Sequence, residues 1–402
     1  MCKATRSFNI QHLTFIMPLL LFAARANAQS TIDAVLSAIA RNNKTIQASE
    51  QYWEAKHLEY KTGLAPYNPT VEYDYLVGSP ESAGNQTEIE VSQAFDFPSV
   101  YFKKKQLANE QMAQTDFHLL AQRQEILLEA KKACLELIYR NKLQVQLEER
   151  KQNSERLLKD FQTKLDKGEG NKLDVNKTRL QLLEVTKQYD ENVSALDQLN
   201  TKLTQLNGGN PILFTDTTYP VTTSMLSFEE LEAEIESSDP VRNVLEQEQN
   251  VAQKQVELSK SLWLPKLEAG YRYVDVPGQK FNGVHTGITV PLWANANTVK
   301  QQKARLLFSD LELQDHRNEH YHEIKKLYER YENVKKSLED YQTAFASLES
   351  ETLLNKALSL GHLSTIEYFM EINYYNTAYN NYLHTEYEFY TVIAELFKYR
   401  LN

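Results

Sequence analysis

Histidine and carboxylate side chains gather at one place in the sequence, around residues 316–322. His316 and His320 are four positions apart, so on a helix they share one face, as two ligands of a metal ion do. The surrounding residues are mostly charged, and the segment lacks the HExxH pattern of zinc enzymes. We therefore predict a solvated helix face without a bound metal, and the spacing of the histidines leaves a metal site as the alternative.

Four short motifs that mark common active sites are absent from the sequence. It has no GxSxG, no P-loop, no GxGxxG and no CxxC. An exported hydrolase on a helical frame would need a catalytic constellation, so we predict that the protein is not an enzyme and uses no cofactor. The net charge of −10 argues against a nucleic-acid partner.

The N-terminal segment 1–28 is typical of a cleaved signal peptide. Lys3 and Arg6 form a basic start, an apolar stretch follows at 13–24, and the Ala-Asn-Ala of residues 26–28 fits the cleavage pattern. We therefore expect an exported protein.

Cleavage would leave Cys134 as the one remaining cysteine, so we expect no disulfide within the chain and no lipid anchor. Cys134 falls at an apolar heptad position, which predicts a small buried side chain.

Residues 64–206 and 262–400 are two copies of one pattern. Each copy has two alternating segments separated by a polar break, then a long helix, a glycine turn and a return helix. An internal repeat of this kind predicts a duplicated architecture. The predicted regions are the signal peptide at 1–28, a first repeat at 29–210, a linker at mid-height at 211–226, and a second repeat at 227–402.

The predicted helices fall into two length classes. Those near 100–166 and 295–359 would each span roughly 100 Å at about 1.5 Å per residue. Two of the shorter helices placed end to end match one long helix, so we predict a rod with an irregular break at 208–220 at mid-height. The shorter helices lie near 31–62, 171–206, 227–262 and 364–400.

Apolar residues spaced alternately by three and four positions indicate a coiled coil in the helix near 295–359. A similar seam near the C-terminus contains one acid, Glu386. Tyrosines crowd into that second region, and we interpret them as packing between helices; a lining that stacks on substrate is the alternative. The coiled-coil positions are Ile324, Leu327, Tyr331, Val334, Leu338, Tyr341, Phe345 and Leu348. The tyrosines are Tyr374, Tyr375, Tyr379, Tyr382, Tyr387 and Tyr390.

Four segments alternate between apolar and polar residues, as half-buried strands do. They lie within 63–78, 87–98, 263–278 and 283–294. Each predicted strand has about the length that a tilted strand needs to cross a bilayer. Four strands cannot close a barrel, and open sheet edges do not occur in lipid, so several chains would have to share one barrel. A soluble hairpin pair with one solvated face is the alternative.

The ordered set of these features resembles the TolC-like outer membrane factor family, which includes the CusC-type efflux channels for heavy metals and drugs. The resemblance rests on the duplication, on VSQAFDFP and ITVPLW at the strand-to-helix junctions, and on the glycine turns KGEGNKLDV and LGHLSTIEY. It implies a mainly α-helical fold whose coiled-coil hairpins form a periplasmic α-barrel. It also implies four transmembrane strands per protomer, so that a trimer closes a twelve-stranded β-barrel.

The resemblance further implies the exit duct of a tripartite efflux or type I secretion system in a Gram-negative outer membrane. The expected partners are two further copies of the chain, outer membrane lipid, a periplasmic adaptor (membrane fusion protein), and an inner-membrane pump of RND or ABC type. A periplasmic coiled-coil scaffold without a pore is the alternative. The transported substrate cannot be read from the sequence, because a duct need not recognise its cargo.

The resemblance also gives roles to residues at the helical tips. Acids at Asp174, Glu367 and Glu371 are expected to face the pore, although an acid near a helix N-terminus is also favoured by the helix dipole. The family places Asp where this chain has Glu367, and some members carry a gating Arg where it has Leu363, so no salt-bridged gate is predicted. The expected adaptor-docking residues are Gly168, Gly170, Asn171, Leu173, Gly361, Leu363, Ser364 and Ile366.

Aromatic residues on the predicted strands suit the boundary between lipid and water, where tyrosine is enriched. The expected interface residues are Tyr73, Tyr75, Tyr271 and Tyr273.

Overall fold

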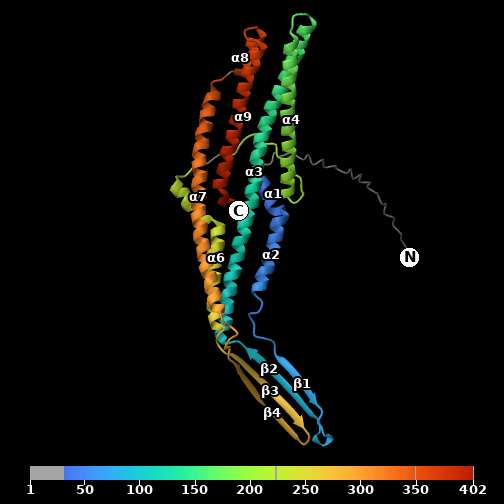
Figure 1. The fold of residues 1–402 in the computed structure, drawn as a ribbon, viewed down its shortest axis with the longest axis vertical. Helices are drawn as coiled ribbons and strands as arrows, with labels where there is room; N and C mark the ends of the chain where they lie inside the picture. The colour runs from blue at the N-terminus through green and yellow to red at the C-terminus, as the bar shows by residue number, and fades with distance from the viewer. Residues whose placement is uncertain (1–30, 222–223, 349, 402) are drawn as a thin grey trace, which may run out of the picture.

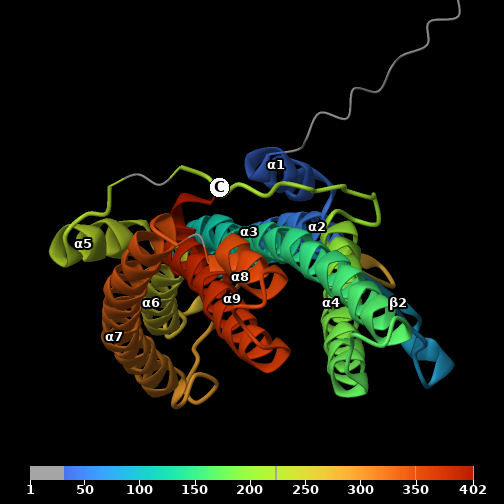
Figure 2. The same cartoon turned by 90° about the horizontal axis from the view of Figure 1, so that it is seen from above.

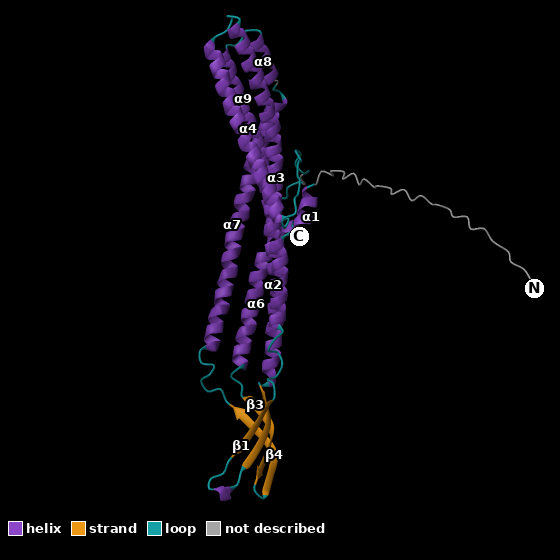
Figure 3. Ribbon diagram, turned by 90° about the vertical axis from the view of Figure 1, so that its right-hand side faces the viewer, coloured by secondary structure: helices purple, strands orange, loops and turns teal. Residues whose placement is uncertain are grey.

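The protein is a long helical rod with a small β-sheet at one end and two helical tips at the other (Figures 1 and 3). The computed structural model describes residues 31–221, 224–348 and 350–401, so the predicted signal peptide lies outside the described residues. Among the described residues, no helix is both long enough and apolar enough to cross a membrane.

One helix, α3 (Pro98–Asp166), runs from the sheet to the tip and organises the others. Its 69 residues correspond to about 100 Å at 1.5 Å per residue, as predicted. On the sheet side it packs against α2 and α6, and on the tip side against α4 and α9. The shorter helices are α1 (Ile32–Asn42), α2 (Lys44–Tyr60), α4 (Lys172–Leu206), α5 (Phe228–Ser238), α6 (Pro240–Ser261), α8 (Ser350–Ser359) and α9 (Thr365–Leu396).

Three of the predicted helices are interrupted. The helix expected at 295–359 consists of α7 (Thr298–Ala346) and α8, so Leu348 lies beyond the end of α7 and is exposed rather than in the seam. The helix expected at 31–62 breaks at Asn43, which caps α2. The helix expected at 227–262 breaks at Asp239, because Pro240 has no N–H for a continuing helix and suits a first position.

At mid-height, α4 is joined end to end with the α1–α2 pair. The buried Asn43 side chain donates to the Leu206 carbonyl in the last turn of α4 (2.7 Å) and accepts from the N–H groups of Thr45 and Ile46. Asn42 donates to Asn207 beside it (3.0 Å). One buried asparagine thus satisfies groups at the ends of two helices, which otherwise lack intrahelical partners.

The second repeat has a corresponding joint between the end of α9 and helix α5. Arg400, in the short 3₁₀ helix η2 (Lys398–Arg400), pairs with Glu234 at 2.8 Å. This guanidinium lowers the pKa of Glu234. The shorter helices therefore stack in pairs alongside α3 and α7, as the length classes predicted.

The chain between α4 and α5 packs across the rod at this height. Phe214 is buried beside Cys134, and Tyr219 stacks on Tyr390 with ring centroids 4.2 Å apart. Cys134 is buried, which confirms the prediction of a small buried side chain, and burial raises the pKa of its thiol to about 12. Seen from above, α1, α5 and this linker all lie on the same side of the helix layer (Figure 2).

The seam between α3 and α9 contains the acid noted in the sequence. Glu386 is nearly buried, and Lys142 of α3 lies 2.7 Å from its carboxylate. Ring contacts fill the seams on both sides of α9. Tyr387 stacks on Tyr139 of α3, and Tyr379 and Tyr382 pack against Phe345 of α7. These tyrosines therefore pack between helices, as predicted, whereas Tyr374 is 79% exposed.

The sheet is antiparallel with strand order β1-β2-β3-β4. Its register sets Val71, Val91, Tyr271 and Val284 in one row across all four strands. These four side chains are exposed in the single chain, so the middle of one face of the sheet is apolar and uncovered. Asp275 and Lys280 lie on the same face, at the end where β3 turns into β4. The strands are β1 (Thr70–Leu76), β2 (Gln86–Phe95), β3 (Lys266–Val276) and β4 (Gln279–Thr289), with a 3₁₀ turn at Glu81–Ala83.

The junction between β2 and α3 is fixed by a buried carboxylate. Asp96 is 3% exposed and pairs with Lys104 of α3 at 2.8 Å. Its own N–H donates to the hydroxyl of Tyr101 (2.9 Å). Pro98 follows as the first residue of α3. Residues 96–98, the DFP that ends the motif VSQAFDFP, therefore set the angle between the sheet and α3.

Near the tip, Tyr368 joins three helices. Its ring is 1% exposed, and its hydroxyl donates to Asn355 of α8 (2.8 Å) and accepts from Asn153 of α3 (3.2 Å). Because the hydroxyl is buried, both amides depend on it for these bonds.

We predict that Tyr368→Phe lowers the stability of the tip by about 1–3 kcal/mol, because two hydrogen bonds to half-buried amides are lost. The melting temperature of detergent-solubilised protein should fall. Tyr374→Phe, which removes the same atom from an exposed ring, is the control and should leave it unchanged. Equal melting temperatures for the two variants would contradict the role given to Tyr368.

Candidate functional site

The two helical turns at the end opposite the sheet have the same geometry (Figure 1). After α3, Gly168 (φ +78°) donates to Leu165 and Glu169 donates to Lys164. After α8, Gly361 (φ +73°) donates to Leu358 and His362 donates to Ala357. This bond pair is the Schellman motif, which places a residue in the left-handed region and therefore favours glycine.

The predicted docking residues divide between exposed and structural positions. Gly168 and Gly361 have open space around them, whereas a Cβ on Gly170 would meet the backbone N of Leu165 at 2.5 Å. Gly170 is therefore required for the turn itself. Asn171 caps α4 by accepting from the N–H of Leu173 (2.9 Å). Leu173, Ser364 and Ile366 are exposed, and Leu363 is half-buried.

Glu367 has a structural role that we did not predict. It forms a capping box with Ser364: its carboxylate accepts from the Ser364 N–H (2.8 Å), and the Ser364 hydroxyl accepts from the Glu367 N–H (3.3 Å). These bonds lower the pKa of the exposed Glu367 carboxyl. The S-x-x-E spacing at 364–367 is the sequence pattern that could have indicated it.

The other two predicted pore acids lie near the starts of the return helices, Asp174 in the first turn of α4 and Glu371 in the second turn of α9. Asp174 is half-buried in the first turn of α4, where the helix dipole also favours it. Glu371 is exposed and borders a groove of about 380 Å³ whose other walls are apolar. That groove is lined by Phe345, Leu348, Leu353, Leu354, Tyr374, Tyr375 and Ala378. The single chain does not bring the three acids together, because they lie on two separate hairpins.

Large apolar side chains at the tips are exposed in the single chain. On α9, Ile366, Met370 and Tyr374 recur every four residues and so share one face. On α4, Leu180 and Leu183 are each more than 60% exposed. Contiguous apolar surface of this kind is characteristic of a face covered by another chain.

Over its middle, the sheet separates apolar from charged side chains. Tyr73, Tyr75 and Tyr271 are exposed, and Tyr273 is half-buried and donates to Asp275 (3.2 Å). The opposite face is polar, and there Arg272 pairs with Glu88 and Glu90 of the neighbouring strand. A sheet with one apolar face and one charged face fits a wall between lipid and water.

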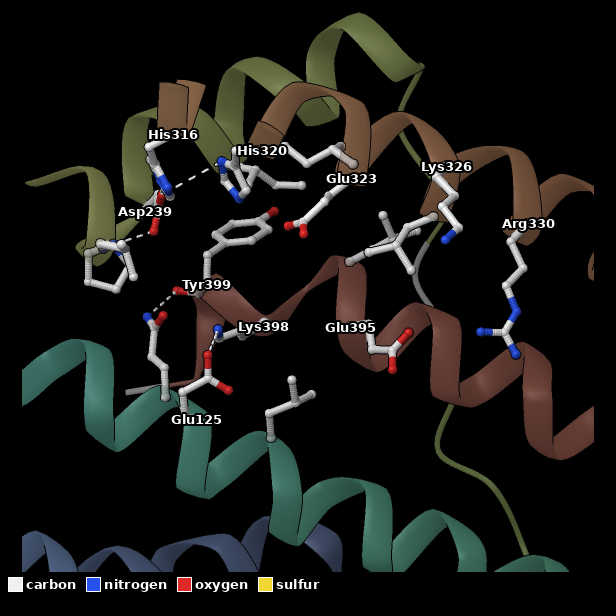
Figure 4. Close-up of a pocket in the computed structure, with 18 residues that line it drawn as sticks. Glu125, Asp239, His316, His320, Glu323, Lys326, Arg330, Glu395, Lys398 and Tyr399 are labelled. Carbon is white, nitrogen blue, oxygen red and sulfur yellow. Dashed lines mark hydrogen bonds and ion pairs between the residues drawn. The ribbon is translucent and has the colours of Figure 1, made fainter. Parts of the chain in front are cut away.

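The prediction of a solvated face at His316 and His320 is wrong. Both side chains are about one-fifth exposed, because the elbow between α5 and α6 covers them, and both are directed toward Asp239 (Figure 4). His322, two residues further along α7, is exposed as predicted. The covering elbow is distant in sequence, so the heptad pattern of α7 alone could not reveal it.

No known protein-family description and no curated protein matches this sequence. Solved structures do match over nearly the whole chain. CusC has a TM-score of 0.77 at 14% identity, with 92% of each chain covered. The CmeC outer membrane channel of Campylobacter jejuni has a TM-score of 0.72 at 14% identity, covering 99% of this chain and 94% of that one.

The MtrE outer membrane channel of Neisseria gonorrhoeae, in its open state, has a TM-score of 0.71 at 12% identity. The match covers 93% of this chain and 89% of the MtrE chain. At identities this low, a structural match establishes the fold alone. For the fold, the match confirms the resemblance seen in the sequence. The chain has the fold of the TolC-like outer membrane channels.

Proposed function

We propose that this protein is the outer membrane exit duct of a tripartite efflux or type I secretion system and works as a homotrimer. The observation that carries the proposal is the four-stranded sheet with an exposed apolar face. β1 and β4 each pair on one side only, so a single chain leaves two edges of unpaired backbone groups. Such edges are excluded from lipid unless further strands pair with them.

Three copies supply the missing partners. Pairing of β4 with β1 of the next chain closes a barrel whose outer face is the apolar row and whose lumen is the charged face. The exposed leucines of α4 and the apolar stripe of α9 would be covered at the same time by neighbouring chains. The protein would then be a conduit rather than an enzyme, with energy supplied by an RND or ABC pump in the inner membrane.

A pair of adjacent residues tests this assembly. Val284 lies on the apolar face and His285 on the polar face of β4. Val284→Arg places a charge against lipid, at a penalty of about 2–4 kcal/mol near mid-membrane, and should abolish stable trimer and bilayer conductance. His285→Arg should preserve both. The readouts are mass by light scattering in detergent and single-channel current.

A monodisperse monomer that retains its full strand content would contradict the duct and favour the periplasmic scaffold. If the two arginine variants behave equally, the apolar face of the sheet does not contact lipid, and the proposal is likewise contradicted.

We also propose that the two glycine turns receive the hairpin of a periplasmic adaptor. They lie at the end of the rod farthest from the sheet, and their exposed residues include Leu173 and Ile366. The open space around Gly361 leaves room for a partner helix to approach closely.

Gly361→Trp should abolish efflux complementation while leaving trimer and membrane insertion intact, because the ring fills the approach space. Gly361→Ala is the matched control. It imposes the same left-handed backbone, at about 1–2 kcal/mol, without the bulk, and should retain efflux. If the tryptophan variant also retains efflux, the turn does not contact the adaptor.

The acids at the tip suit a cation-sensitive entrance. In a trimer, Glu367 and Glu371 would each be present three times around the axis, with Asp174 contributing from the other hairpin. Ionised carboxylates a few ångströms apart repel by roughly 1–4 kcal/mol per pair, and a multivalent cation relieves this repulsion.

We predict that a trivalent cation added from the periplasmic side blocks conductance, and that Glu367→Gln with Glu371→Gln weakens block by about tenfold or more. Glutamine can still accept the capping bond from Ser364, so the tip keeps its fold. In the single chain that bond lowers the pKa of Glu367. Like charges in the proposed ring oppose this shift, and block should weaken as falling pH protonates the ring. Equal block in the double variant would place the constriction elsewhere.

A further inference from the structure

Two histidines of α7 and one aspartate at the elbow between α5 and α6 meet at the edge of a pocket (Figure 4). His316 and His320 lie one turn apart on α7, and their rings are stacked with centroids 5.2 Å apart. Asp239 lies at the elbow between α5 and α6, where its side chain also accepts from the N–H groups of Val241 and Arg242. In the sequence, all of α6, β3 and β4 and the first part of α7 separate the elbow from the histidines, so only folding brings them together.

The ligand atoms of these three residues have the separations of a small metal site. Nε2 of His316 is 2.7 Å from Oδ2 of Asp239, and Nδ1 of His320 is 3.6 Å from the same oxygen. All three atoms lie within 4.8 Å of one another. Ligands at about 2.0–2.2 Å from a tetrahedral zinc ion are themselves about 3.3 Å apart, so the observed distances bracket the required geometry.

These side chains are more buried than those of an ordinary cluster of charged residues on a protein surface. Asp239 is 7% exposed, and Nδ1 of His320 is buried without a hydrogen-bond partner among the described residues. A buried ring nitrogen without a partner is unfavourable unless something satisfies it. A cation between the three side chains would bind this nitrogen directly.

A second acid is available to complete the coordination. Oε2 of Glu236 is 3.9 Å from Nδ1 of His320. The other oxygen of Glu236 is held by Arg242 at 3.1 Å and lies 3.8 Å from Arg317. These two arginines therefore fix the orientation of Glu236 and leave its second oxygen directed toward the histidines. The group borders a cavity of about 580 Å³, which gives a metal ion and a bound water a path of entry.

We propose that Asp239, His316 and His320 form a resident site for a divalent transition-metal ion of the zinc class, with Glu236 or a water as the fourth ligand. Two imidazoles and a carboxylate are a donor set that suits zinc rather than calcium or magnesium, which prefer oxygen alone. The ion would fasten the α5–α6 elbow to α7. This site lies away from both the tips and the sheet, so it is independent of the transported substrate and of the proposed duct function.

The test uses purified, tag-free mature protein in detergent, freed of metal by a chelator, and ZnCl₂ as the probe. Calorimetric titration should give one saturable site per chain. His316→Gln and His320→Gln should each weaken the affinity by about tenfold or more, as loss of a metal ligand does. Glutamine at 316 can still donate to Asp239, so this variant removes the ligand while keeping the hydrogen bond.

Two further variants serve as a companion and a control. Asp239→Asn keeps the oxygen that caps α6 but loses the negative charge, so the helix should persist while zinc binding weakens. His322→Gln changes an exposed imidazole on the same helix and should bind zinc as the wild type does. Zinc should raise the melting temperature of the wild type and of His322→Gln only.

A measurement on the unmutated protein tests the site without depending on whether the variants fold. Zinc should protect His316 and His320, but not His322, from modification by diethylpyrocarbonate. Absence of saturable binding, or binding and protection that do not depend on His316 and His320, would overturn the proposal. His316 and Asp239 would then form a hydrogen bond only.

Discussion

The four-stranded sheet has two unpaired edges that need partner strands, and the rest of the molecule depends on this need. A sheet of this size, exposed on its apolar face and open at β1 and β4, is not a stable end state in either water or lipid. In the proposed trimer, the helices must therefore deliver the sheets of the three chains to one place and in one orientation. The buried Asp96 and the unbroken α3 meet this need, because they connect the sheet rigidly to a helix that spans the whole rod.

The rest of the rod follows from the length of α3. No single partner helix matches it, so shorter helices cover it in two levels and meet at mid-height. Each meeting point leaves helix ends whose backbone groups need partners, and Asn43 and the Arg400–Glu234 pair occupy these points. The linker, with Phe214 and Tyr219, packs over the same level. Mid-height is thus the level at which the two repeats are joined.

Much of this architecture could be predicted from the sequence, because it rests on periodicity. The four strands, the length of α3 and the burial of Cys134 follow from patterns with periods of two or of three and four. The interruptions at Asn43, at Asp239 and after the end of α7 were missed, because polar residues inside a long apolar repeat are easily taken for surface positions of one continuous helix. The contacts of His316 and Tyr368 were missed for another reason. They depend on partners in other helices, which no local pattern contains.

The pair formed by Lys142 and Glu386 has a consequence for how the helices find their alignment. A heptad seam looks nearly the same after a slide of seven residues, about 10 Å, so apolar packing alone distinguishes poorly between such alternatives. Because α9 runs antiparallel to α3, such a slide would set Glu386 near the level of Leu135 in one direction and of Glu149 in the other. Either slide separates Glu386 from Lys142, so the nearly buried carboxylate loses this counter-ion. The same slide also breaks the second ion pair of this seam, between Lys132 and Glu395. These two pairs, each of little value to stability by itself, together favour a single axial alignment among several that the apolar residues would accept.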